Sequence, residues 1–146
     1  MSDEQPGLRL RVAQESRRIS SQHRQLDALH ALVAEALEQV DAARAGQCFL
    51  RLKDALDAHM SLEDELYFPA LHGLRPDLEG ELTGLARDHQ RFRAELETLT
   101  RHFDAGELGI SQAGLDRFAG AFAAHELREE SLVDPDRPHR MEDAKP

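Results

Sequence analysis

Apolar residues recur at intervals of three, four and seven along most of the chain, which is the period of an amphipathic α-helix. No stretch of useful length alternates polar and apolar residues as a half-buried strand would. Gly46 is the stop signal after the first periodic segment, Pro69 lies in the last turn of the second or just beyond it, and Ser111 caps the start of the fourth. The pattern therefore predicts four helices, over residues 8–40, 48–71, 77–103 and 111–133.

Four amphipathic helices joined by short connections bury their apolar stripes when they pack antiparallel. The sequence thus predicts an all-α fold, an up-down-up-down antiparallel four-helix bundle over residues 8–133. Residues 1–7 are expected to form a disordered N-terminus and residues 134–146, which contain three prolines, a disordered C-terminal tail. A chain of 146 residues has room for a single domain of this kind.

Composition and charge restrict the partners. The chain has 18 basic and 28 acidic residues, and its formal net charge of −10 would repel phosphate backbones and anionic membrane surfaces. We therefore expect no nucleic-acid and no membrane partner. The polar start of the chain lacks an apolar leader, and no long apolar run suits a membrane span. Cys48 is the single cysteine and cannot form an intramolecular disulfide, so a reducing, cytoplasmic location is expected.

An internal repeat organises the polar residues of the predicted core. Shifting the sequence by 66 residues places apolar residues on apolar residues and also aligns three polar pairs. These pairs are His23 with His89, His59 with His125, and Glu63 with Glu129. A helical hairpin used twice would give the bundle an internal two-fold axis.

The repeated residues form a metal-ligand set. A histidine and a glutamate four residues apart lie on one face of a helix, so His59 with Glu63 and His125 with Glu129 each offer an imidazole and a carboxylate to one point. His23 and His89 add one imidazole each from the other two helices. Four imidazoles and two bridging carboxylates suit two divalent metals. A nitrogen and oxygen set without thiolate favours iron or manganese, with zinc as a further option.

The flanking residues carry more weight than the spacing, because glutamate is common in this chain. All four histidines lie on the apolar stripes: Leu52 and Leu56 precede His59, and Phe118 and Phe122 precede His125, at the same offsets. Polar groups facing a core are costly unless they have partners, and a metal pair would remove that cost. For any one histidine taken alone, an ordinary role in the core or at a helix end is the alternative.

The pattern resembles the hemerythrin-like (HHE cation-binding) family from about Ser20 to Pro135. The resemblance lies in a histidine on the first helix, His-x-x-x-Glu on the second, a histidine on the third, and a histidine with a carboxylate on the fourth. It implies that His23, His59, Glu63, His89, His125 and Glu129 hold two iron ions. Arg93 stands where resemblance to the oxygen carriers would place a fifth histidine. The chain therefore looks more like the four-His, two-Glu branch, which includes the di-iron proteins implicated in repair of iron–sulfur clusters and in nitric oxide or peroxide chemistry.

Other polar residues are assigned by their positions. His30 is expected at the boundary of the site, and Tyr67 is expected to pack at the rim of the bundle rather than to approach the metals. Glu130 could swing toward the site, although Glu129 has the better helical phase. Arg93 and its repeat counterpart Asp27 are expected to place opposite charges beside the site. The remaining polar residues considered are expected to be solvated: Asp64, Glu65, His72, Glu95, Glu97, His102, Glu126 and His139.

Three functions compete. The leading one is a non-haem di-iron protein that binds or reduces a small oxidant, namely oxygen, nitric oxide or peroxide, with a redox partner to reload electrons. The second is an iron-responsive sensing or iron-donating module that acts through a protein partner. The third is a metal-free interaction bundle, in which the six candidate ligands would be ordinary core residues.

Overall fold

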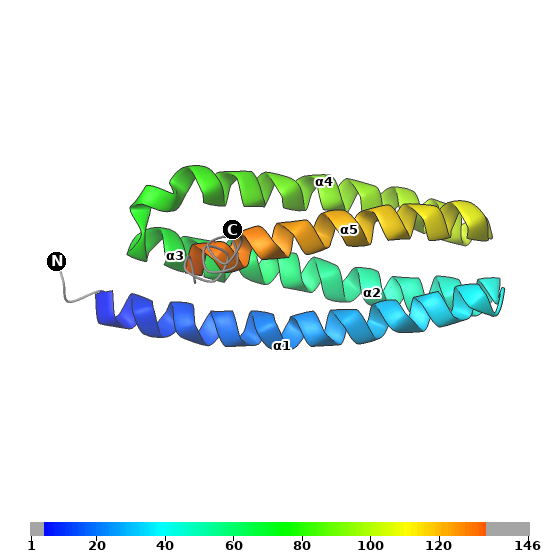
Figure 1. Cartoon of the computed structure of the whole chain (residues 1–146), viewed down its shortest axis with the longest axis horizontal. Helices are drawn as coiled ribbons and strands as arrows, with labels where there is room; N and C mark the ends of the chain where they lie inside the picture. The colour runs from blue at the N-terminus through cyan, green and yellow to red at the C-terminus, as the bar shows by residue number, and fades with distance from the viewer. Residues whose placement is uncertain (1–4, 134–146) are drawn as a thin grey trace, which may run out of the picture.

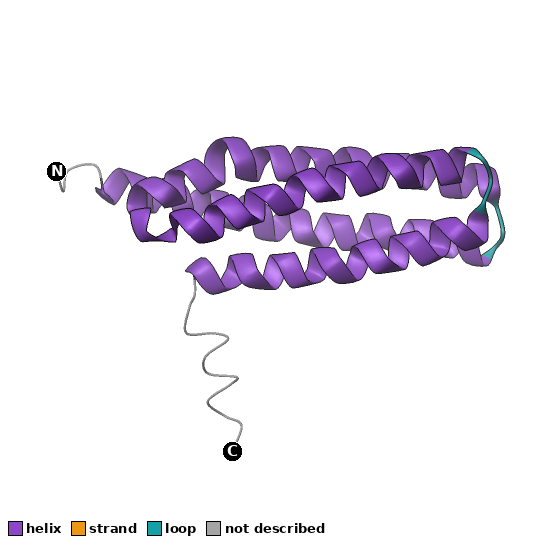
Figure 2. Cartoon of the chain, turned by 90° about the horizontal axis from the view of Figure 1, so that it is seen from above, coloured by secondary structure: helices purple, strands orange, loops and turns teal. Residues whose placement is uncertain are grey.

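The computed structural model describes residues 5–133, and helices account for nearly all of them (Figure 2). No strand occurs within this range. The order of elements is α1 (Gln5–Glu38), α2 (Ala42–Leu62), the π-helical turn η2 (Glu63–Tyr67), α3 (Phe68–Leu74), the 3-10 turn η3 (Pro76–Leu78), α4 (Glu79–Asp104) and α5 (Leu108–Val133). The predicted disorder of residues 1–4 and 134–146 falls outside the described residues, whereas residues 5–7, also expected to be disordered, belong to α1.

The helices run up, down, up and down along one long axis (Figure 1). Helix α1 leads to a tight turn at one end, and α2, η2 and α3 return as a nearly continuous rod. Helix α4 then runs back beside α2, and α5 returns beside α4. Contacts between α1 and α5 close the ring, so the predicted all-α four-helix bundle is confirmed. None of the helices described between residues 5 and 133 combines the length and apolar character that crossing a bilayer requires.

The turn between α1 and α2 is tighter than predicted. Val40 adopts a left-handed backbone with φ of 54°, which reverses the chain. The Asp41 side chain accepts a hydrogen bond from the Arg44 backbone N–H at 3.1 Å and so caps α2. The prediction that Gly46 acts as a stop signal is wrong, because Gly46 lies inside α2, which begins at Ala42.

The start of α5 also differs from the prediction. Gly106 has a φ of +73° and allows the chain to turn between α4 and α5. Helix α5 begins at Leu108, so Ser111 lies inside its first turn, where its backbone N–H donates to the Glu107 carbonyl oxygen at 2.9 Å. Ser111 is therefore a buried helical residue and not the predicted cap.

Pro69 does not terminate the nearly continuous rod of α2, η2 and α3. Proline lacks an N–H and its ring clashes with the carbonyl four residues earlier in a regular α-helix. The chain accommodates Pro69 by widening the preceding turn into η2, where the Phe68 N–H bonds to the Glu63 carbonyl oxygen. The helix then continues through α3 to Leu74. A π-helical turn therefore begins at Glu63, one of the predicted metal ligands.

Two apolar clusters fill the bundle on either side of a polar layer. One is built around Phe49, Phe92 and Phe118, toward the α1–α2 turn, and the other around Tyr67 and Phe68, toward the opposite end. The polar layer between them contains the predicted ligands: Ile19 and Leu26, which flank His23, belong to different clusters, and Leu85 and Phe92 do the same around His89, as do Leu56 and Leu62 around His59.

Candidate metal centre

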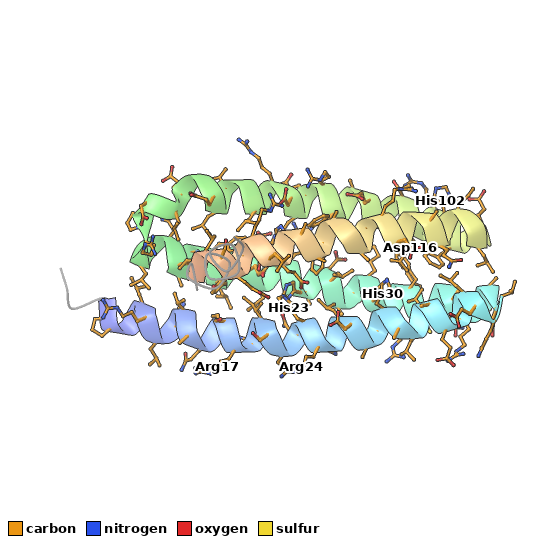
Figure 3. All side chains as sticks on the ribbon, in the orientation of Figure 1. Arg17, His23, Arg24, His30, His102 and Asp116 are labelled. Carbon is orange, nitrogen blue, oxygen red and sulfur yellow. The ribbon has the colours of Figure 1, made fainter. Side chains whose placement is uncertain are left out.

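All six predicted ligands come together in the polar layer. The side chains of His59, Glu63, His89, His125 and Glu129 are almost fully buried, whereas the His23 side chain is 19% exposed. His23 reaches from α1 toward the interior, while Arg17 and Arg24 on the same helix point away from it (Figure 3). The helical periodicity of each apolar stripe places these side chains on the inner faces of four separate helices.

Four side chains form the first group, Glu63, His89, His125 and Glu129, whose ligand atoms all lie within 4.8 Å of one another. His89 Nε2 is 2.9 Å from Glu63 Oε1 and 3.1 Å from His125 Nε2. His125 Nε2 is 2.6 Å from Glu129 Oε2. Atoms that each lie about 2.0 to 2.2 Å from one metal ion stand about 3 to 4 Å apart, so this spacing fits a shared ion.

The second group consists of His23, His59 and Glu63. His59 Nε2 lies 3.3 Å from Glu63 Oε2, while the other oxygen of Glu63 faces His89. Glu63 thus presents one carboxylate oxygen to each group. This is the arrangement of a bridging carboxylate between two metal positions.

Buried polar atoms without a hydrogen-bond partner among the described residues support metal binding at the site. The buried side-chain atoms without a hydrogen-bond partner among the described residues include His23 Nε2, His59 Nε2, both oxygens of Glu63 and Glu129 Oε2. Although several of these atoms are close together, their geometry is not that of hydrogen bonds. A buried polar atom without a partner costs about 1 to 3 kcal/mol, and a divalent ion at each position would coordinate these atoms and remove that cost. The residues present therefore fit a pair of metal ions.

Without metal, the two buried carboxyl groups cannot both be charged. Burial and the adjacent charge of Glu63 raise the pKa of Glu129 far above its ordinary value. Burial also opposes ionisation of Glu63, but the close approach of Glu129, His59 and His89 outweighs burial and lowers the pKa of Glu63. The pair accordingly shares one proton in the metal-free protein, as carboxyl groups do when they share a site.

In three of the histidines, the Nδ1 atom is hydrogen-bonded to a side-chain oxygen from another helical element. These atoms lie 2.8 Å from Gln22 Oε1 for His59, 2.8 Å from Asp64 Oδ1 for His89, and 3.0 Å from Asp88 Oδ2 for His125. Each oxygen accepts the Nδ1–H and leaves Nε2 free to bind a metal.

The predicted solvated role of Asp64 is wrong. Besides holding His89, Asp64 pairs with Arg93, whose Nη2 lies 3.2 Å from Asp64 Oδ2. Asp64 thus connects Arg93 to His89. The repeat counterpart of Arg93, Asp27, is exposed and lines a cavity between α1 and α5, and its place beside the site stays a prediction.

Glu126 was also predicted to be solvated, yet its Oε2 lies 2.8 Å from His23 Nε2. Burial alone would lower the pKa of His23, but the proximity and charge of Glu126 outweigh burial and raise it. Glu130 adds negative charge near His23 and has its own interactions, while Glu129 supplies the oxygen to the first group.

Tyr67 packs in the second apolar cluster, as expected, but it is almost fully buried rather than at the rim. Burial and the negative charge of the Glu63–Glu129 pair raise the pKa of its phenol. His30 lines the α1–α5 cavity, and its buried Nε2 has no hydrogen-bond partner among the described residues.

The histidines expected to be solvated lie away from the site. His72 is exposed at the end of the bundle, with Nε2 3.3 Å from Glu79 Oε1. His102 Nδ1 lies 2.7 Å from Glu107 Oε1 at the α4–α5 turn. The prediction for His139 falls outside the described residues.

Fold and site together define a metal-binding four-helix bundle. The family model described as hemerythrin HHE cation binding domain matches residues 15–135, and the chain therefore belongs to this family. No curated protein and no solved structure matches the chain.

Proposed function

We propose that the protein is a non-haem di-iron protein that binds or reduces a small oxidant: oxygen, nitric oxide or peroxide. The observation that carries this proposal is Glu63, whose two oxygens face two separate groups of buried imidazoles and carboxylates. Two metal positions that share a carboxylate are typical of centres that act on one ligand with two electrons. We further place the chain in the four-His, two-Glu branch of the family, since Arg93 occupies the place of a fifth histidine and pairs with Asp64.

Iron suits the ligand set better than a thiophilic metal. The six side chains offer four imidazole nitrogens and carboxylate oxygens, and none is a cysteine. Iron and manganese accept such mixed nitrogen and oxygen ligation, while zinc is most often held by four ligands or by three and a water. When bound, ferrous iron with an open coordination position would take a diatomic ligand or peroxide and supply electrons to it.

A cavity between α1 and α5 supports a small and uncharged ligand. Its volume is about 140 Å³, which is enough for a diatomic molecule. Leu52, Leu56 and Phe122 line it, and Glu126, which also lines it, approaches His23. Phe122 is in ring contact with both His59 and His125, so the apolar wall reaches the site itself.

The chain's own residues have three roles in this proposal. The apolar clusters above and below the site keep water away from it. The oxygens behind His59, His89 and His125 fix each ring, so that Nε2 points inward. Glu63 and Glu129 compensate the charge of the cations inside the bundle.

Absorption spectroscopy tests the proposal. Protein loaded anaerobically with ferrous iron should develop a new visible band on addition of nitric oxide, and the oxidised protein should respond to azide. Iron-loaded protein whose spectrum neither ligand changes would contradict an open position. A partner captured only in the iron-loaded or only in the iron-free state, with no ligand response, would instead favour the iron-responsive sensing or iron-donating module.

A further inference from the structure

The two halves of the repeat have the same ligands but differ in the residues that hydrogen-bond to the Nδ1 atoms of those ligands. Gln22 and Asp88 occupy equivalent places, 66 residues apart, and each holds the Nδ1 of a histidine on the following helix. Behind His59 this residue is a neutral amide, whereas behind His125 it is a carboxylate. In the first metal group the other histidine, His89, also has a carboxylate behind it, that of Asp64.

A carboxylate makes the imidazole in front of it a stronger ligand. Its charge-assisted hydrogen bond from Nδ1–H gives the ring partial imidazolate character, which raises the electron density that Nε2 offers to a cation. The two carboxylates behind the first group are themselves fixed by arginines. Asp64 pairs with Arg93, and Asp88 pairs with Arg91 at 3.0 Å and with Arg128.

The second metal group is weaker in two further respects. It has three ligands, one of them the shared Glu63, against four in the first group. In addition, the Oε2 of Glu126 stands 2.8 Å from His23 Nε2 and competes with a cation for that nitrogen. The repeat counterpart of Glu126 is Met60, so the first group has no equivalent competitor at this position.

We propose that the two metal positions are unequal and that Gln22 is a positioning residue that sets the difference. The position of His89 and His125 fills first and holds its metal tightly. The position of His23 and His59 fills second, exchanges its metal and is the one that faces the α1–α5 cavity through Glu126. This inference rests on the proposed di-metal function and adds the order of filling and the position that receives the external ligand.

Calorimetric titration of the metal-free chain with cobalt(II), read in parallel by the visible absorption of bound cobalt, tests the inference. The wild-type chain should bind cobalt in two resolved steps. The Gln22→Glu variant should tighten the second step by about 10- to 100-fold and leave the first step unchanged. The Gln25→Glu variant is the matched control, since it adds the same charge to the same helix at an exposed position and should change neither step appreciably.

The Asp88→Asn variant provides the reverse test, because it should weaken the first step by about 10- to 100-fold. Two equal steps in the wild-type chain, or a Gln22→Glu second step no tighter than in the control, would overturn the inference and leave the di-metal proposal standing. Binding of fewer than two cobalt ions would contradict the di-metal proposal itself. Because Gln22→Glu is expected to gain affinity, that variant still tests the inference if Asp88→Asn fails to fold.

Discussion

His89 Nε2 and His125 Nε2 lie 3.1 Å apart, although the two residues belong to different helices and both rings are buried. At most one proton can stand between these nitrogens, and the proximity of His89 contributes to the lowered pKa of His125, after burial. The Nδ1 atoms of both rings are already engaged by carboxylates. A cation between the Nε2 atoms satisfies both, which is why the pair is informative about metal binding.

Removing His89 should cost one metal position and spare the other. The His89→Ala variant lacks a ligand of the first group, while the second group of His23, His59 and Glu63 stays intact. Iron content after anaerobic loading should fall by about one ion per chain. The matched control is His102→Ala on the same helix, which removes a partly exposed histidine at the α4–α5 turn and should leave the iron content unchanged. Equal iron content in the two variants would contradict the assignment of His89.

Neutralising Glu129 should stabilise the metal-free protein. Its raised pKa means that the folded chain holds a proton that the unfolded chain releases above the ordinary value of 4.5, so the stability contributed by this group falls as the pH rises. In denaturant unfolding, Glu129→Gln should be more stable than wild type by about 1 to 3 kcal/mol near neutral pH, with the gap closing toward about pH 5.

The control for this comparison is Glu97→Gln, because the Glu97 side chain is 58% exposed. We expect a difference of at most about 0.5 kcal/mol from wild type. A metal-free Glu129→Gln protein that is less stable than wild type at neutral pH would show that the Glu129 carboxyl group does not destabilise the metal-free fold. Metal should reverse the order of stability, since the neutral amide of the Glu129→Gln variant is a poorer ligand than a carboxylate.

Tyr67 reports on the charge of the site from within the core. It is the single tyrosine and tryptophan is absent, so ultraviolet absorption during an alkaline titration follows this one phenol. Burial and the negative charge of the Glu63–Glu129 pair should raise its pKa above the ordinary value of 10.0, and loading with a divalent metal should lower it again by compensating that charge. A metal-free Tyr67 that titrates at the ordinary value while circular dichroism shows intact helices would contradict this environment.

Filling the α1–α5 cavity should slow ligand entry without loss of metal. Ala119 lines this cavity on α5, so Ala119→Phe places a ring in the space of about 140 Å³. Stopped-flow measurement of nitric oxide binding to the iron-loaded protein should show an association rate several-fold lower than in wild type. The control is Ala113→Phe, at an exposed position six residues earlier on the same helix. Equal rates in the two variants would place ligand entry elsewhere.

The fold was predictable because its information is local and periodic. The apolar stripes of the four helices and the brevity of their connections determine an antiparallel bundle, and the repeat that pairs His23 with His89 places the candidate ligands at one level of it. The incorrect predictions concern helix ends, where a single residue can determine the boundary of the helix. Gly46 and Ser111 are both common at helix boundaries, but the observed boundaries depend on the turns at Val40 and Gly106.

The residues that hydrogen-bond to the ligand histidines were harder to predict, because side-chain hydrogen bonds between helices produce no periodic pattern in the sequence. Asp64 follows Glu63 directly and was assigned to a solvated face, yet the turn that widens ahead of Pro69 begins at Glu63 and Asp64 reaches His89. One signal was available: the repeat aligns Gln22 with Asp88, each next to a ligand histidine. Polar residues that a repeat keeps in place but changes in charge are candidates for tuning the site.

A shared di-iron centre is tested by the number of iron ions that one chain binds after anaerobic loading and removal of free iron. We expect about two irons per wild-type chain, with a rise in thermal stability on loading. Glu63→Gln should lose most of this iron, since Glu63 belongs to both groups, and the exposed Glu97→Gln control should lose none. Fewer than about one iron per wild-type chain, or a Glu63→Gln variant that keeps its iron, would contradict a shared di-iron centre.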